Sequence, residues 1–364
     1  MRRKPRARAA WAERLNTMFA DLPLWMNVAI LAAAAAVVWL AGTRLCGYAD
    51  AIQKRTGMGE ALVGMLLLGL ITALPEAAVT VTASYAGSPR LAVNNLLGGM
   101  ALNVAILAAA DAAIRREALT AAVATTLPLL QGALLVLMLA IVAAATVAGD
   151  RAVFGIGLWA WLLLAVYFLC VVTVRRARGR EGWVPNGMSG PGRAATVQTA
   201  GGGAQPSDSL RRLAGKTALG AAAILAAGYA IARSGDALAE QTGLGQSFFG
   251  AVFLALTTSL PEMTIVFASV RLGHYAMAIS DIFGANLFGL ALLFVVDAVY
   301  QGEPALADAG RFATFSALLG IAVTALFIAG LLERRHAMIL NMGVDSLLVI
   351  GVYLSGITVL YGLR

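Results

Sequence analysis

The sequence is short of charge. Only 13% of its 364 residues are Asp, Glu, Lys or Arg, whereas 60% are hydrophobic, and the mean hydropathy is +0.81. Soluble globular domains carry roughly 25% charged residues. This scarcity excludes a soluble protein. It predicts a multi-pass integral protein of the cell membrane, with the lipid bilayer as its surroundings.

Residues that build common catalytic and metal sites are also scarce. The chain has two cysteines, Cys46 and Cys170, which lie in separate apolar stretches without CxxC spacing, and only two histidines. That pattern excludes a disulfide framework and a zinc site. The motifs of intramembrane hydrolases, such as HExxH or GxGD, do not occur in the sequence. We therefore expect neither an enzyme nor a bound cofactor.

What the chain does have is a series of long apolar runs. A helix needs about 20 apolar residues to cross a hydrocarbon core of ~30 Å. Ten runs reach that length, and none shows the strict alternation of a barrel strand, so we expect helices. The runs are Leu24–Tyr48, Gly57–Ala86, Pro89–Ile114, Ala121–Ala148, Ala152–Val174, Leu213–Ser234, Gly243–Val270, His274–Tyr300, Phe312–Leu332 and Met338–Gly362.

A polar stretch rich in Gly and Arg, 175–212, separates these runs into two groups of five. Such a composition cannot bury a core and predicts a flexible linker. The chain thus divides into a basic N-terminal tail at 1–23, a first half at 24–174, the linker, and a second half at 213–362. The net charge of +8 lies chiefly in the tail and the linker. Basic loops of this kind orient a membrane protein and do not indicate nucleic-acid binding.

One segment occurs twice. Gly57–Asp111 returns 186 residues later, without a gap, as Gly243–Asp297, and 15 of the 55 aligned positions are identical. Matching Gly, Pro and acidic positions indicate a duplicated membrane unit. Because equivalent helices are five spans apart, they cross the bilayer in opposite directions. The predicted fold is therefore an all-α polytopic membrane protein with about ten transmembrane helices in two inverted five-helix repeats.

Each repeat carries a glutamate at membrane depth. Glu76 lies 11 residues before Gly87, which at ~1.5 Å per residue places it ~16 Å deep, and Glu262 is equally deep. A charged side chain at the bilayer centre costs at least ~2.5 kcal/mol. The interiors of the predicted spans offer no Lys or Arg to neutralise these glutamates. Binding of a cation or a proton is the best account of the pair.

Further oxygen ligands are expected around the glutamates. Pro75 and Pro261 remove backbone donors and free carbonyl oxygens one turn upstream, and hard cations bind such oxygens together with carboxylates. Polar side chains nearby extend the oxygen-rich surface: Thr72, Thr258 and Ser259 precede the glutamates, and Asn95 and Asp281 occupy equivalent places in the next helix of each repeat.

Other functions of these polar residues stay open. Asn95 taken alone could serve only to join helices, which is a common role of polar residues in membranes. Asp111 and Asp297 are also equivalent in the two repeats but lie near span ends, where a structural or vestibular role is expected.

The motifs Thr-Ala-Leu-Pro-Glu and Thr-Ser-Leu-Pro-Glu, each followed by an Asn or Asp before a glycine, resemble the calcium/cation antiporter superfamily of the sodium/calcium exchanger type. The resemblance covers both repeats and implies the family's ten-helix fold. It also implies ion-binding roles for matching residues: Glu76 and Glu262 as central ligands, Asn95 and Asp281 as their polar partners, and Thr72, Thr258 and Ser259 as hydroxyl or carbonyl contributors.

The chain departs from the family pattern at Ala73, where the pattern has serine. The missing hydroxyl leaves the coupling ion open between Na⁺ and H⁺. We predict a secondary antiporter that exchanges Ca²⁺ for Na⁺ or H⁺ by alternating access, with the first and sixth spans as candidate moving elements from the resemblance. The alternatives are a monovalent cation/proton or other divalent-metal antiporter using the same site, and a passive channel. Stoichiometry and oligomeric state stay open.

Overall fold

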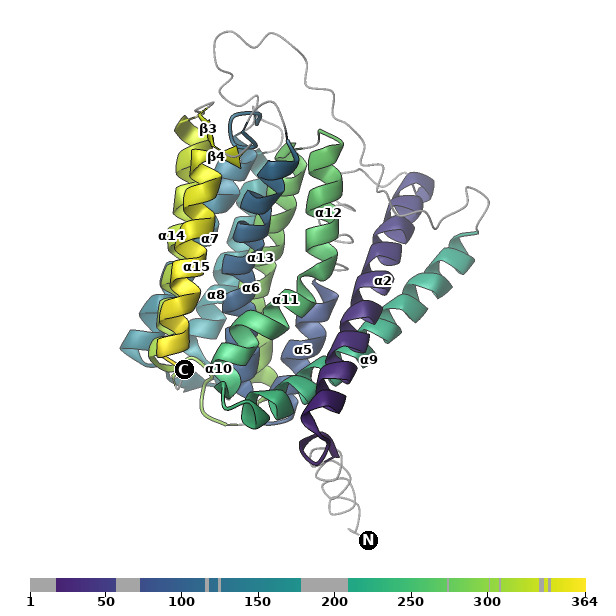
Figure 1. Ribbon diagram of the computed structural model, residues 1–364, viewed down its shortest axis with the longest axis vertical. Coiled ribbons are helices and arrows are strands. Elements are labelled where there is room, and N and C mark those ends of the chain that lie inside the picture. Colours follow the sequence, from purple (N-terminus) through teal and green to yellow (C-terminus); the bar gives the residue numbers. More distant parts are fainter. Residues whose placement is uncertain are drawn as a thin grey trace.

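The computed structural model describes residues 18–56, 73–114, 118–123, 126–177, 209–273, 275–300, 302–307, 309–333, 337–339 and 342–364 (Figure 1). The first half contains α2 (Leu24–Thr56), α5 (Leu74–Tyr85), α6 (Pro89–Ala110), the 3-10 turn η2 (Asp111–Ala113), α7 (Leu127–Ala148), β1 (Ala152–Val153), β2 (Ile156–Gly157) and α8 (Leu158–Ala177). The second half contains α9 (Leu210–Gln241), α10 (Gly245–Phe249), the π-helical turn η3 (Gly250–Leu254), α11 (Ala255–Thr258), α12 (Leu260–Arg271), α13 (Tyr275–Val299), α14 (Gly310–Glu333), β3 (Met338–Ile339), β4 (Met342–Gly343) and α15 (Val344–Gly362).

Long apolar helices dominate the described residues. Eight of them are long and apolar enough to cross a membrane, and α10 to α12 pass the same test together as one segment that bends by 50° at a break. The predicted all-α polytopic fold is confirmed. Of the expected span Gly57–Ala86, the structure describes α5 and the residues that flank it, and residues 57–72 lie outside the described part.

Several expected span boundaries are wrong, and two of them share one cause. The fifth and tenth predicted spans begin at Ala152 and Met338, but the helices α8 and α15 begin six residues later, at Leu158 and Val344. The residues before each helix form a short antiparallel hairpin, β1 with β2 and β3 with β4. Because these residues are mostly apolar, the sequence does not distinguish them from the membrane helix that follows.

The two halves repeat each other in the opposite sense. A shift of 186 residues carries α5 onto α12 from first residue to last. In Figure 1 the helix α2 rises from the N-terminal end while its equivalent α9 descends, and α5 and α12 occupy opposite halves of the bundle. The inverted arrangement predicted from the odd number of spans is confirmed.

Three helices pack against their own equivalents: α2 against α9, α6 against α13, and α7 against α14. At the crossing of α6 and α13, the Asn286 Nδ2 donates a hydrogen bond of 3.1 Å to the carbonyl oxygen of Met100, its equivalent in the other half. Asn103 Nδ2 donates to Asn286 Oδ1 at 3.0 Å. Equivalent positions touch only at a symmetry axis, so the pseudo-two-fold axis passes through this crossing.

Asp111 and Asp297 connect each half to the hairpin of the other. The two carboxylate oxygens of Asp111 accept from the Leu119 and Gly343 amides at 2.6 Å each. Those of Asp297 accept from the Ala305 and Gly157 amides at 2.8 and 2.9 Å. All four donors are related by the 186-residue shift. These hydrogen bonds support the structural role, and we call each set an aspartate clamp.

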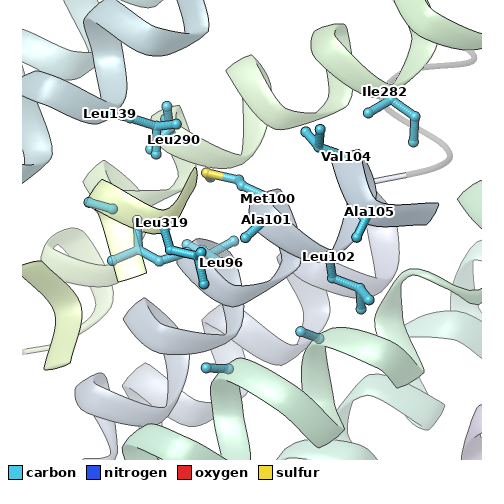
Figure 2. Packing of buried hydrophobic residues seen from close by; sticks show 14 of the residues in the cluster. Leu96, Met100, Ala101, Leu102, Val104, Ala105, Leu139, Ile282, Leu290 and Leu319 are labelled. Carbon is cyan, nitrogen blue, oxygen red and sulfur yellow. The ribbon is translucent and has the colours of Figure 1, made fainter. Parts of the chain in front are cut away.

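The helix α6 lies at the centre of the bundle and is buried on nearly all sides, mostly through apolar residues together with Asn94, Asn95 and Asn103. Figure 2 shows its Leu96, Met100 and Val104 among side chains from the surrounding helices, including Leu139 of α7 and Leu319 of α14. A helix that is hydrophobic all round is buried on all sides. Such a position allows α6 to support side chains from both repeats.

Glycine lets a second-half turn approach α6 closely. A side chain on Gly98 would collide with the backbone of Ala251 in η3, and one on Gly250 would collide with the carbonyl oxygen of Leu91. A close backbone approach therefore occurs at Gly98. A side chain on the equivalent Gly284 would meet only the Gln131 amide at 3.8 Å among the described residues, so no such approach occurs there.

Candidate cation site

The helices that carry the two glutamates begin in the same way. Pro75 and Pro261 occupy the first turns of α5 and α12, a position that needs no backbone donor. The residues two positions before these prolines, Ala73 and Ser259, have almost the same backbone angles, φ −82° with ψ 1° and φ −82° with ψ 4°. The Pro-Glu sequence thus lies in the first turn of a helix in each half; in the second half, where the preceding residues are described, this start is a break within one apolar segment.

Both glutamates lie in the first turn of their helix, where the amide dipoles favour negative charge. Glu262 is buried, and Glu76 is half-buried. One carboxylate oxygen of each, Oε2, is enclosed and accepts no hydrogen bond from the part of the chain that the structure describes. Since buried polar atoms are normally paired, the two oxygens are suited to a ligand that brings positive charge.

Neighbouring polar side chains are unpaired in the same way. Both amide atoms of Asn95 on α6, Oδ2 of Asp281 on α13, and Oγ of Ser259 are enclosed without a hydrogen-bond partner. The buried Thr258 donates from Oγ1 to the Ala255 carbonyl at 3.2 Å, so its lone pairs stay available. The predicted ligand Thr72 lies outside the described residues.

The four helices that carry these groups meet across the two repeats. α6 packs against α5 and α12, and α13 also packs against both. Glu262 is close enough to Glu76 and to Asp281 for the three carboxylates to repel one another. Each repeat therefore contributes to one shared polar region at the middle of the bundle.

The carboxylates do not form a complete coordination shell. Within the described ranges, no three acidic, His or Cys side chains come together closely enough to hold a metal ion by themselves. A cation here would need further oxygens, and the hydroxyls, amide and carbonyls at the helix breaks are of the kind that hard cations bind. The residues present fit a weakly held, exchangeable cation better than a permanent metal centre.

The helix pair α2 and α9 reaches this region through glycines. A side chain on Gly42 of α2 would press on the ring of Pro261, beside Glu262. One on Gly228 of α9, the equivalent of Gly42, would collide with Ala78 of α5. Each of these helices thus contacts the glutamate-bearing helix of the opposite half, and α2 adds a hydrogen bond of 2.7 Å from Trp39 Nε1 to Thr264 Oγ1.

Sequence reasoning missed one buried cation. It placed no basic residue inside a span, but Arg233 is buried within α9, 3.6 Å from Asp236. The predicted span ended at Ser234, whereas α9 continues to Gln241. The only available signal was the i, i+3 spacing of an Arg and an Asp near a span end.

Inverted membrane repeats whose polar groups meet at the middle of the bundle are the architecture of a secondary transporter. The family model described as sodium/calcium exchanger protein matches residues 26–176 and 213–362, so the chain belongs to the sodium/calcium exchanger protein family. The protein is accordingly a multi-pass membrane antiporter of cations, in a family of transporters and not of enzymes.

Known proteins resemble it over most of its length. The inner membrane protein YrbG of Escherichia coli K12 is 25% identical over 289 residues, which are 79% of this chain and 81% of YrbG. Two solved structures share the fold. The sodium-calcium exchanger NCX_Mj has a TM-score of 0.59 at 13% identity and covers 92% of this chain and 99% of its own. The H⁺/Ca²⁺ exchanger CAX has a TM-score of 0.67 at 12% identity, over 93% and 85%.

Proposed function

We propose that this protein is a secondary active antiporter that exchanges Ca²⁺ for a monovalent counter-cation, Na⁺ or H⁺, by alternating access. One observation carries the proposal: Glu76 and Glu262, at equivalent helix breaks of inverted repeats, each hold an enclosed carboxylate oxygen without a protein partner. The exchangers NCX_Mj and CAX, which share the fold, support Ca²⁺ as the divalent substrate.

The proposed Ca²⁺ ligands are hard oxygens from both halves. Glu76 and Glu262 supply the negative charge, and Asp281 is close enough to Glu262 to add to it. Asn95 would contribute its amide oxygen, while Thr72, Thr258 and Ser259 would contribute hydroxyl or carbonyl oxygens. Ca²⁺ accepts six to eight such ligands in flexible geometry, which suits a site that must release its ion in every cycle.

Coupling follows from mutual repulsion at shared ligands. An empty site holds up to three carboxylates in a region of low dielectric, and their repulsion and desolvation disfavour any state that closes around them. A bound Ca²⁺ removes that penalty, and so do monovalent cations or protons on the same oxygens. The transporter can therefore change its facing only when the site is loaded.

The moving element proposed for this change is the pair α2 and α9. Both helices reach the opposite repeat at glycines, Gly42 beside Pro261 and Gly228 beside Ala78. Small residues let membrane helices slide at close distance. Because Gly42 contacts the residue next to Glu262, a change at the glutamates would be transmitted directly to α2.

Ala73 favours H⁺ over Na⁺ as the counter-ion. It is buried at the break before Glu76, where the second half has the unpaired hydroxyl of Ser259. Na⁺ needs several oxygen ligands at once, and the first half has a methyl group in their place. A proton needs only the carboxylate. A monovalent cation/proton or other divalent-metal antiporter would use the same ligands.

An ion-replacement assay tests the proposal. The purified protein is reconstituted into proteoliposomes, and uptake of radioactive calcium is measured under an imposed Na⁺ gradient and, separately, under an imposed pH gradient. We expect saturable uptake under at least one gradient and none when the gradient is collapsed with an ionophore. Uptake that persists without a counter-ion gradient would identify a channel, and no calcium uptake at all would remove Ca²⁺ as the substrate.

A further inference from the structure

A row of hydroxyl groups leads away from Glu76 along one face of α5. Thr80 and Ser84 follow Glu76 at intervals of four residues, which places all three side chains on the same side of a helix. Along the axis they lie about 6 and 12 Å from the glutamate. Ala78, on the opposite side of α5, is the residue that contacts α9 at Gly228. The row therefore faces the interior of the bundle.

Both hydroxyls are buried and unused. Thr80 is 0% exposed and Ser84 is 1% exposed. Neither Thr80 Oγ1 nor Ser84 Oγ has a hydrogen-bond partner among the described residues, although Ser and Thr in helices commonly donate to the carbonyl one turn back. Buried hydroxyls without a partner are rare in folded proteins. A row of two beside a buried carboxylate indicates that water or an ion completes their bonding.

The row ends at a charged group near the membrane surface. Ser88, four residues after Ser84, donates from Oγ to Asp236 Oδ2 at 2.9 Å. Gln246 Nε2 donates to Asp236 Oδ1 at 2.6 Å, and Arg233 lies 3.6 Å from Oδ2. This end of α5 lies at the same end of the bundle as the C-terminal end of α9 (Figure 1). A carboxylate thus stands at each end of the hydroxyl row.

The second half has no such row. The positions equivalent to Thr80 and Ser84 are Val266 and Val270, which are as well buried, at 0% and 2% exposed. Valine has nearly the shape of threonine but cannot bind water or an ion. Packing alone therefore does not require hydroxyls at these places, because the equivalent helix fills them with apolar groups.

We propose that Thr80, Ser84 and Ser88 form an entry path for the monovalent counter-cation, hydrated or as a proton carried by water, between Asp236 and Glu76. The proposal rests on the antiport function proposed above. The hydroxyls replace part of the water shell as the cation passes, and the α5 face opens when the transporter faces this side. The α12 face offers no equivalent path, so the two sides of the membrane reach the site through unlike surroundings.

The first test removes the two hydroxyl groups of the row on α5 and leaves the proposed cation ligands unchanged. In Thr80→Val combined with Ser84→Ala, we expect the maximal exchange rate to fall about tenfold, the effect of one or two lost net hydrogen bonds to the passing ion. The half-saturating Ca²⁺ concentration should not change. The loss of exchange rate should appear under the gradient that drives the wild-type protein, either Na⁺ or pH. The gradient under which the rate falls identifies the ion that uses the path.

A matched control removes hydroxyls elsewhere. Ser316 and Thr324 on α14 are also buried and unpaired, each 1% exposed. Ser316→Ala combined with Thr324→Val should keep the exchange rate within about twofold, since no passing ion uses them. An unchanged rate in the α5 variant, or equal losses in both variants, would overturn the path. Absence of exchange in the wild type would instead overturn the antiport function.

A second test does not depend on transport. In a chain whose two native cysteines are replaced, Ser84→Cys and Val270→Cys place thiols at equivalent depths on opposite sides. A small membrane-impermeant thiol reagent should modify the cysteine at 84 from the Ser88 side and leave the one at 270 unmodified from the other side. Equal modification of the two, or protection of both, contradicts a water-filled path restricted to α5.

Discussion

The two halves of the chain agree in what holds the bundle together and differ in what surrounds the cation site. The two aspartate clamps have donors at equivalent positions, with hydrogen bonds of 2.6 Å to Asp111 and of 2.8 to 2.9 Å to Asp297. Each glutamate directly follows a proline, and the residues that begin the two helices, Ala73 and Ser259, have almost the same backbone angles. Symmetry is thus kept in the contacts that join the two halves and in the turns that begin the glutamate-bearing helices.

Three of the positions that differ between the halves lie close to the glutamates along the chain or on the next helix. Ala73 stands opposite Ser259, Asn95 opposite Asp281, and Thr80 opposite Val266. All six positions lie on the helices that carry the site or on the residues that begin them. In the proposed antiporter, the inverted repeat supplies the movement, while departures from the repeat determine which ions are handled and how they are reached.

The largest expected effect comes from breaking the glutamate pair. Glu76→Gln and Glu262→Gln should each reduce gradient-driven calcium uptake to about a hundredth or less, because a charge-assisted contact of ~3 kcal/mol is lost. Uptake into proteoliposomes measures it. Glu303→Gln, in an exposed loop, is the control and should transport normally. Normal uptake by either site variant would remove that glutamate from the shared site.

The aspartate clamps should show an effect on stability that is the same in both halves. Asp111→Ala and Asp297→Ala each leave two buried amides without an acceptor, at ~1 to 3 kcal/mol per hydrogen bond. We expect both variants to unfold at clearly lower temperature in detergent, by similar amounts. Asp21→Ala, exposed in a turn, should melt with the wild type. If only one clamp variant loses stability, the two clamps are not equivalent.

The smallest effect is expected from restoring the symmetry at residue 73. Ala73→Ser places a hydroxyl where the second half has Ser259. We expect Na⁺-driven uptake to increase two- to tenfold relative to pH-driven uptake, the value of about one net hydrogen bond. Ser259→Ala should move the same ratio in the opposite direction. A ratio that stays constant in both variants would show that these hydroxyls do not select the counter-ion.

Much of this fold could be predicted from the sequence because its two strongest signals, long apolar runs and an internal repeat, are simple patterns along the chain. Apolar length predicted the spans, and the 186-residue shift between identical Gly, Pro and acidic positions predicted the inversion. The pairing of Glu76 with Glu262 followed from the same shift. Each of these inferences needed only one-dimensional information, since equivalent positions in a repeat have equivalent environments.

The rest depended on contacts that sequence spacing does not encode. The β1–β2 hairpin turns at Phe154 and Gly155, both with positive φ, and Phe-Gly in an apolar run lacks the Asn-Gly or Asp-Gly signal of such turns. The role of Asp111 required knowing that Gly343 lies beside it, 232 residues away. Arg233 could be placed only once the true length of α9 was known.

The contact between Asn286 and Met100 has a consequence for how this architecture could be assembled. At a two-fold axis, a symmetric dimer of identical half-length subunits would set a side chain against its own copy, Asn against Asn or Met against Met. Here an amide on one side meets a backbone carbonyl on the other. Unlike sequences in the two halves are what permit this contact, and they free every other position to change on one side of the membrane alone.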